Sequence, residues 1–211
     1  MIRLLIADDH VLIREGFRRI VENEIDMDLV GEASNAGEAL HTLQASDVDV
    51  MVLDISMPGK SGLDFLEEVK RFSPETSVLI QSVHPEDSYA IRALKAGAAG
   101  YITKSGHGDE LLKAIRKIAR GGRYVSESLA EALAFALQQE TSEAPHSRLS
   151  TREYQVMIQF AEGKGSAEIA RNLSLSRSTI NTYRSRILEK LDLSRTSDII
   201  HYAIDNRLLD R

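Results

Sequence analysis

The sequence contains no cysteine among its 211 residues, which excludes disulfides, cysteine-ligated zinc and cysteine nucleophiles. It also contains no apolar run that approaches the roughly 18 residues of a membrane-spanning helix. The amino terminus has only a short apolar run before two acids, so we expect no signal peptide. The six histidines show no paired spacing typical of a metal site, and we expect them to be scattered. These absences predict a soluble, cytoplasmic protein that makes no contact with a membrane.

Positive charge is scarce over most of the chain. The net charge of −6 argues against a uniformly basic nucleic-acid-binding protein. Residues 1–145 contain 15 Lys and Arg against 24 Asp and Glu, whereas residues 146–211 contain 11 against 8. This asymmetry predicts two units with different partners.

Short apolar runs alternate with amphipathic stretches in the first part of the chain. The apolar runs predict strands at residues 3–7, 29–33, 48–54, 77–82 and 100–103. The amphipathic stretches predict helices at residues 11–23, 36–44, 61–72, 86–96 and 108–120. Such alternation predicts an α/β fold with a parallel sheet covered on both faces. Functional sites in these sheets lie at the carboxyl ends of the strands.

The chain beyond residue 124 has a different pattern. An alanine- and leucine-rich stretch at 128–139 predicts a helix, and the polar residues 140–147, with one proline, predict a linker. Further helices are predicted at residues 151–162, 166–172, 177–191 and 196–206. We therefore predict three segments: an α/β domain over 1–124, a helical extension and linker over 125–147, and a small all-α domain over 148–211.

Acidic residues end two of the predicted strands, Asp8 and Asp9 the first and Asp54 the third. If these strands are parallel neighbours, the three carboxylates lie close together, and raised pKa values or a bound cation must offset their repulsion. Oxygen ligands without Cys or His suit Mg²⁺. Lys104 and Ser82 end two other strands. The whole set predicts a site that binds a phosphoryl group.

Four motifs follow one another in the first part of the chain: "ADDH", "VLDISMPGKSGLDFL", "QSVH" and "GYITKS". In their order and spacing, residues 1 to about 122 resemble the receiver domain of two-component response regulators. The resemblance implies a flavodoxin-like fold in which Asp54 accepts a phosphoryl group from a sensor histidine kinase. The resemblance also implies that Asp9 binds Mg²⁺, with help from Asp8 and the backbone carbonyl of Ser56. It implies that Lys104 and Ser82 contact oxygens of the phosphoryl group. Tyr101 is implied to be the aromatic residue that rotates on the output face. Serine at 82 and valine at 11 are positions where the family itself varies, and neither removes a required group.

The helix predicted at residues 177–191 has an apolar face and a polar face. The apolar positions are Ile180, Tyr183, Ile187 and Leu191. Small polar residues flanked by arginines suit a helix that enters the major groove of DNA. The candidate DNA-binding residues are Arg177, Ser178, Asn181, Thr182, Arg184, Ser185, Arg186 and Lys190. The alternative is an ordinary solvated face on a helical bundle.

Five short motifs mark the last part of the chain: "TRE", "EIA", "STI", "KL" and "SR". With these motifs in register, residues 149 to about 209 resemble the LuxR-type helix-turn-helix domain of NarL/FixJ response regulators. The resemblance implies that Asn181, Thr182 and Ser185 face the bases, and that the helix at 196–206 pairs two such domains in a homodimer. Because many relatives have Lys or His where this chain has Asn181 and Tyr183, no target sequence is carried over.

Together the two resemblances imply a transcription regulator rather than an enzyme, with at most slow self-phosphorylation and self-dephosphorylation at Asp54. Phosphorylation would favour dimerisation and binding to double-stranded promoter DNA. A phosphatase of the haloacid dehalogenase type is disfavoured, because it needs a second acid two residues after the nucleophile and this chain has Ser56 there. The remaining alternative is a DNA-binding regulator that never needs phosphate and uses its receiver for protein contacts.

Overall fold

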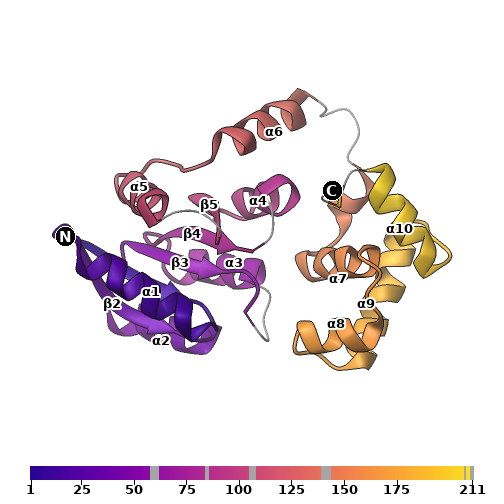
Figure 1. Ribbon diagram of the computed structural model, residues 1–211, viewed down its shortest axis with the longest axis horizontal. Coiled ribbons are helices and arrows are strands. Elements are labelled where there is room, and N and C mark those ends of the chain that lie inside the picture. Colours follow the sequence, from indigo (N-terminus) through magenta and orange to yellow (C-terminus); the bar gives the residue numbers. More distant parts are fainter. Residues whose placement is uncertain (58–61, 84–85, 105–107, 139–143, 207, 210–211) are drawn as a thin grey trace. The chain divides into compact units, whose positions relative to one another are not determined.

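The computed structural model describes residues 1–57, 62–83, 86–104, 108–138, 144–206 and 208–209. The chain divides into two compact units, Met1–Phe135 and Ala136–Arg211, and each is described by itself. Figure 1 shows the helices and strands of both units. Among the described residues, no helix is both long enough and apolar enough to cross a membrane.

The first unit alternates strands and helices along the chain (Figure 1). Its strands are β1 (Ile2–Ala7), β2 (Met27–Ala33), β3 (Val50–Asp54), β4 (Ser77–Ser82) and β5 (Gly100–Thr103). Its helices are α1 (Val11–Glu22), α2 (Ala36–Ala45), α3 (Gly62–Phe72), α4 (Glu86–Lys95) and α5 (Gly108–Ala119), and α6 (Glu127–Gln138) continues into the second unit. These bounds lie within about two residues of the predicted ones, and Ser61 and Gln139, which were predicted to be helical, lie outside the described residues.

The five strands form one parallel sheet in the order β2-β1-β3-β4-β5, which confirms the predicted flavodoxin-like fold. β1 lies beside β3, with Ala7 opposite Leu53. Consequently the chain leaves both strands at the same edge of the sheet. The strand order reverses between β1 and β3, and ligand sites of open α/β sheets form at such a reversal.

Apolar side chains are buried on both faces of the sheet. On one face, alternate strand residues pack against α1 and α5 in a single core, which contains Leu4, Ile6, Phe17, Val50, Val52, Leu79, Ile102, Leu112 and Ile115 among others. The intervening residues Leu5, Met51 and Leu53 are also fully buried, and α2 and α4 contact the strands. Each such side chain stabilises the fold by about 1.5–3 kcal/mol when it is fully buried. This packing holds the strand ends at fixed positions.

The second unit is helical throughout its described residues. It contains the short 3₁₀ helix η1 (Pro145–Arg148) and the helices α7 (Thr151–Ala161), α8 (Ser166–Asn172), α9 (Arg177–Lys190) and α10 (Thr196–Asp205). α8 and α9 are joined by a tight turn in which Ser174 has a φ of 51°. The hydroxyl of Ser176 then accepts the N–H of Thr179 at 3.0 Å and caps the start of α9. The two helices thus form a helix-turn-helix, as predicted.

Part of the predicted linker at 140–147 is ordered as η1. Residues 140–143 lie outside the described residues, whereas Pro145 begins the 3₁₀ helix. The backbone N–H of His146 donates to the hydroxyl of Tyr202 in α10 at 3.2 Å. This contact, between residues far apart in the chain, attaches the segment to the helical unit, and the local polar pattern gives no sign of it.

Candidate functional site

Charged side chains meet at the edge of the sheet where β1, β3 and β5 end. Lys104 Nζ lies 2.6 Å from Asp8 Oδ2 and 2.7 Å from Asp54 Oδ2. Asp8 and Asp54 are each only 1 % exposed, and the Lys104 side chain is 8 % exposed. The structure therefore brings together three of the residues that the sequence placed at strand ends.

Burial and ion pairing shift the pKa values of Asp54 and Lys104 in opposite directions. Burial raises the pKa of Asp54, and the Lys104 ammonium and the Ser56 N–H offset part of that rise. Burial alone would lower the pKa of Lys104, but Asp54 and Asp8 outweigh it and raise the pKa. The N–H of Ser56 donates to Asp54 Oδ1 at 2.7 Å. One cation and one backbone donor thus hold the Asp54 carboxylate in place.

Asp9 adds a third carboxylate to the cluster. Its Oδ1 is buried and accepts no well-aligned hydrogen bond in the described part of the chain. Ligand atoms of Asp8, Asp9, His10 and Asp54 all lie within 4.8 Å of one another. Because three carboxylates face a single ammonium, negative charge remains for a cation to neutralise. The donor set fits a divalent cation such as Mg²⁺, which prefers carboxylate oxygens.

His10 belongs to this cluster, although the sequence analysis did not assign it a role. Its ring Nδ1 lies 3.0 Å from Asp8 Oδ1 and 3.0 Å from Asp9 Oδ1. A single histidine has no spacing that would indicate a metal site. The sequence signal for His10 is its position directly after two strand-end acids in "ADDH".

Ser82 and Tyr101 are both fully buried near this edge. The carbonyl of Ser82 accepts the N–H of Lys104 at 2.7 Å, which joins the ends of β4 and β5. Tyr101 lies in β5 opposite Ile80 of β4. A rotation of the Tyr101 side chain would need a second position for that side chain, so it stays a prediction. The binding of Mg²⁺ by the backbone carbonyl of Ser56 also stays a prediction.

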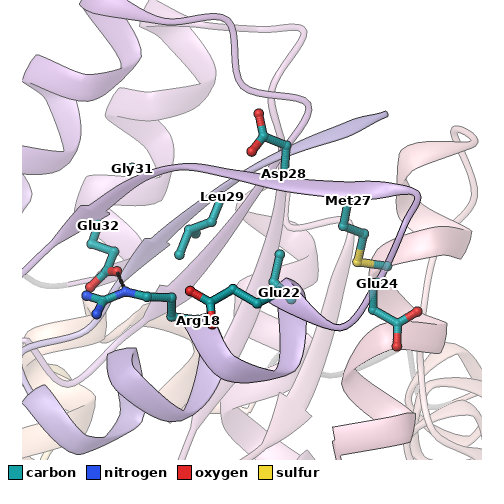
Figure 2. Close-up of a pocket in the computed structure, with 9 residues that line it drawn as sticks. Arg18, Glu22, Glu24, Met27, Asp28, Leu29, Gly31 and Glu32 are labelled. Atoms are coloured by element: carbon teal, nitrogen blue, oxygen red, sulfur yellow. Dashed lines mark hydrogen bonds and ion pairs between the residues drawn. The ribbon is translucent and has the colours of Figure 1, made fainter.

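Described residues of the first unit also line cavities away from the carboxylates of the site. One of about 180 Å³ reaches Lys104 and is lined mainly by apolar residues of α1 and α5. The other, of about 590 Å³, lies between α1 and β2 (Figure 2). In it Arg18 Nε pairs with Glu32 at 2.6 Å, at the end of the cavity away from Met27 and Glu24. The larger cavity contains none of the predicted site residues, so the strand-end cluster is the better candidate for phosphoryl chemistry.

The predicted DNA-binding face of α9 is largely exposed. The exposed members are Arg177, Ser178, Thr182, Ser185, Arg186 and Lys190, and the half-buried ones are Asn181 and Arg184. On the opposite side Ile180, Ile187 and Leu191 are buried, as predicted. Tyr183, which was also predicted to face the core, is only half-buried.

Two hydroxyls on this face are already bonded within the helix. Thr182 Oγ1 donates to the carbonyl of Ser178 at 3.1 Å, and Ser185 Oγ donates to the carbonyl of Asn181 at 3.2 Å. Each hydroxyl keeps oxygen lone pairs with which it can accept a hydrogen bond. These side chains can therefore accept a donor from a base edge without losing their internal bond.

Lys190 makes a contact that the sequence analysis did not anticipate. Its Nζ lies 2.6 Å from Glu153, a residue of α7 that is only 3 % exposed. Burial acts to raise the pKa of Glu153, but hydrogen bonds from Lys190 and Ser150 outweigh it and lower the pKa. Lys190 thus links α9 to α7, and its predicted contact with DNA stays a prediction.

Comparison with known proteins gives a match for each unit. Residues 4–116 match the response regulator receiver domain, and residues 147–203 match the bacterial regulatory proteins of the luxR family. Response regulator UvrY from Escherichia coli (strain K12) is 36 % identical over 209 residues, which cover 99 % of this chain and 96 % of UvrY.

Solved structures of RcsB resemble the chain over most of its length. RcsB from Salmonella enterica serovar Typhimurium, bound to promoter rprA in the presence of the phosphomimetic BeF3−, has a TM-score of 0.65 and 25 % identity, covering 95 % of this chain and 97 % of RcsB. A structure of two RcsB dimers bound to two parallel DNAs has a TM-score of 0.60 and 27 % identity, covering 95 % and 96 %.

Proposed function

The chain belongs to the response regulators that join a receiver domain to a LuxR-type DNA-binding domain, and we propose that phosphorylation of Asp54 controls its binding to promoter DNA. The observation that carries this proposal is the buried contact of Lys104 with both Asp8 and Asp54. A buried carboxylate beside an ammonium and two further acids has the groups that phosphoryl transfer needs. The proposed domains are the receiver over residues 1–124, the connection over 125–147 and the DNA-binding domain over 148–211.

The proposed reaction takes place on the Asp54 carboxylate. A carboxylate oxygen attacks the phosphorus of a phosphohistidine on a sensor histidine kinase. The O–P bond forms as the P–N bond breaks, and the electron pair returns to the kinase imidazole. Lys104 and the hydroxyl of Ser82 then contact oxygens of the transferred group. Without the kinase, only slow self-phosphorylation and self-dephosphorylation are expected.

The proposed cation is Mg²⁺, held by Asp9 and Asp54 with help from Asp8 and the carbonyl of Ser56. When bound, Mg²⁺ neutralises charge on phosphoryl oxygens. The grouping of the Asp8, Asp9 and Asp54 carboxylates, with ligand atoms within 4.8 Å of one another, supports this assignment. Lys104 supplies the other positive charge, because its Nζ lies 2.7 Å from Asp54 Oδ2.

The proposed output is a homodimer that binds double-stranded DNA in the cytoplasm. Phosphorylation adds about 1.5–2 negative charges and strong acceptor oxygens to a buried site. Ser82 and Tyr101 would convey that change to the dimer surface. α10 exposes Ile204 by 57 %, which suits pairing of two DNA-binding domains, and the RcsB neighbours include dimers bound to DNA. The polar residues of α9 would then enter the major groove.

The test is intact-mass measurement after incubation with a small phosphodonor and Mg²⁺. We expect the full chain to gain one phosphoryl group and Asp54→Ala to gain none. Asp28→Asn, which changes an exposed acid of β2, is the matched control and should be phosphorylated normally. If Asp54→Ala is phosphorylated as well as the parent, the assignment of the acceptor is wrong.

The second measurement is DNA affinity before and after phosphorylation, with sequences selected from a random pool by the phosphorylated protein. We expect phosphorylation to tighten binding in the parent and to leave Asp54→Ala unchanged. Equal affinity in both states of the parent would instead support a regulator whose receiver makes only protein contacts.

A further inference from the structure

Arg14 of α1 reaches back to the turn that follows β1. Its guanidinium Nη1 donates to the backbone carbonyl of Asp8 at 2.6 Å. We propose that Arg14 is a positioning residue for phosphoryl transfer: by holding this carbonyl, it fixes the turn that presents Asp8 and Asp9 to Asp54. The inference rests on the proposed function, because it concerns the same reaction. It adds a residue that acts through the backbone of that site.

The carbonyl of Asp8 lies just beyond the strand. Ala7 is the last residue of β1, and the N–H of Asp8 still donates to the carbonyl of Ala33 in β2 at 3.0 Å. Asp8 itself belongs neither to β1 nor to α1, and it is only 1 % exposed. A buried carbonyl without a donor is costly, and a guanidinium supplies a charge-assisted hydrogen bond that is stronger than a neutral one. Arg14 therefore fixes the orientation of the peptide between Asp8 and Asp9.

The Arg14 side chain is itself held in place. It is 16 % exposed, and its Nε lies 3.9 Å from Oε2 of Glu32 in β2. Arg18, one helical turn further along α1, pairs with the other oxygen of the same carboxylate at 2.6 Å (Figure 2). Arg18 is more exposed, at 48 % of its side chain. An arginine held by packing and by a nearby carboxylate is already in position before a phosphodonor arrives.

The acid site depends on the peptide that Arg14 holds. The Asp8 carboxylate contacts Lys104 Nζ at 2.6 Å, and ligand atoms of Asp8, Asp9 and Asp54 lie within 4.8 Å of one another. If the peptide between Asp8 and Asp9 rotates to find another donor, the Asp9 carboxylate moves relative to Asp54. A displacement of about 1 Å can slow an enzymatic reaction about 100-fold. A turn that is loosened rather than lost should have a smaller effect, of about tenfold.

The test is the rate at which a small phosphodonor with Mg²⁺ phosphorylates the full chain, measured by intact mass at several donor concentrations. Arg14→Met keeps the length of the side chain and removes its donors, so the maximal rate should fall about tenfold. The half-saturating donor concentration should stay the same, because Arg14 acts through Asp8 and not on the donor. Arg14→Lys keeps a charge and a donor and should bring the rate back to within about threefold of the parent.

The matched control is Arg18→Met, which changes an arginine of the same helix that pairs with the same Glu32, and which should leave the rate unchanged. Urea unfolding of each variant establishes that the protein is folded under the assay conditions. A slower rate in folded Arg14→Met then reports the geometry of the site and not a loss of folded protein.

The outcomes separate this inference from the proposed function. A maximal rate in Arg14→Met equal to that of the parent, or an equal loss in Arg18→Met, overturns the role of the bond to Asp8. A higher half-saturating donor concentration in Arg14→Met would mean that Arg14 contacts the donor directly, which also overturns a positioning role. Phosphorylation of Asp54→Ala as fast as the parent would instead overturn the proposed function, whatever the rate of the Arg14 variants.

Discussion

The candidate sites of the two units differ in how far their charged side chains are exposed to solvent. In the first, Asp8 and Asp54 are almost fully buried around Lys104. In the second, most of the predicted DNA-binding residues of α9 are exposed, and the buried charges Arg152 and Glu153 lie on α7. Burying an ion costs several kcal/mol unless close partners compensate it. A buried cluster is thus sensitive to a single added charge, whereas an exposed face gains energy only through several contacts with an incoming polyanion.

The largest effect is expected from Lys104→Ala. The substitution removes an ammonium that contacts both Asp8 and Asp54, so charge on the transferring group loses a partner in a buried site. Phosphorylation of Asp54 should slow by about 100-fold or more, measured by intact mass over time with a small phosphodonor. Lys113→Ala, on the exposed side of α5, should leave the rate unchanged. A loss of less than about threefold for Lys104→Ala would mean that the ammonium does not act on the transferring group.

The second prediction concerns the stability of the first unit where α3 begins close to the end of β3. A Cβ on Gly62 would lie 2.3 Å from the Cα of Ile55, the buried residue that follows Asp54. Gly62→Ala should therefore push α3 away from the end of β3 and lower the free energy of unfolding by about 3 kcal/mol. Urea unfolding, with hydrogen exchange of β3 to identify the first unit, measures this.

The matched control for that substitution is Gly16→Ala in α1. A Cβ on Gly16 meets nothing within 4 Å. Because alanine favours a helix over glycine, this change should raise the free energy of unfolding by about 0.5–1 kcal/mol. Equal losses for the two substitutions would show that the close approach of Gly62 to Ile55 carries no special cost.

The third prediction tests a buried charge in the second unit. Lys190→Ala leaves the buried carboxylate of Glu153 without its cation and should lower stability by about 2 kcal/mol. The pKa of Glu153 is lower in the folded state than its usual 4.5, so this stabilisation is present above about pH 4.5. It is lost as the pH falls through the lower folded value.

The measurement is urea unfolding of the full chain between pH 3 and pH 7, about the range over which a carboxylate titrates. In Lys190→Ala, the free energy of unfolding should decrease less between pH 7 and pH 3 than in the parent. Arg171→Ala, which removes an exposed cation of α8, should leave this decrease unchanged. If Lys190→Ala affects only DNA binding, the contact with Glu153 contributes little to the fold.

Local sequence patterns predicted most of the fold and the centre of the acid site. Asp54 and Lys104 could be assigned to strand ends because each follows a short apolar run. That Asp8 and Asp54 meet depends on β1 lying beside β3, a pairing that no local pattern determines. The sequence analysis gave it only as a condition, and the sheet order shows that the condition is met.

The contacts that sequence reasoning missed are of a different kind. Glu153 and Lys190 are 37 residues apart, and each looks like an ordinary surface charge in its own helix. The ring of His10 could point to solvent or to the acids with the same local sequence. Such contacts depend on how side chains pack once the helices and strands have assembled. The hydrophobic periodicity of the sequence does not predict that packing.

The smallest expected effect distinguishes two kinds of contact on α9. Arg186 is exposed and suits a contact with a DNA phosphate. Arg186→Ala should therefore weaken binding to selected and unrelated DNA alike, and should reduce the slope of log affinity against log salt concentration by about one. Asn181 has an amide that can read a base edge, so Asn181→Ala should cost about 1 kcal/mol on the selected sequence and almost nothing on unrelated DNA. Arg19→Ala, an exposed arginine of α1, is the control for general loss of charge.

Fluorescence anisotropy at several salt concentrations measures both quantities for each variant. If Asn181→Ala weakens both kinds of DNA equally, Asn181 does not read a base. Sequence discrimination would then have to come from other residues of α9, such as Thr182 or Ser185, whose hydroxyls keep lone pairs free for a base edge. The exposed face would still bind DNA through its arginines, but its specificity would rest on hydroxyl acceptors rather than on an amide. Thr182→Val, which keeps the shape and removes the acceptor, would decide between them.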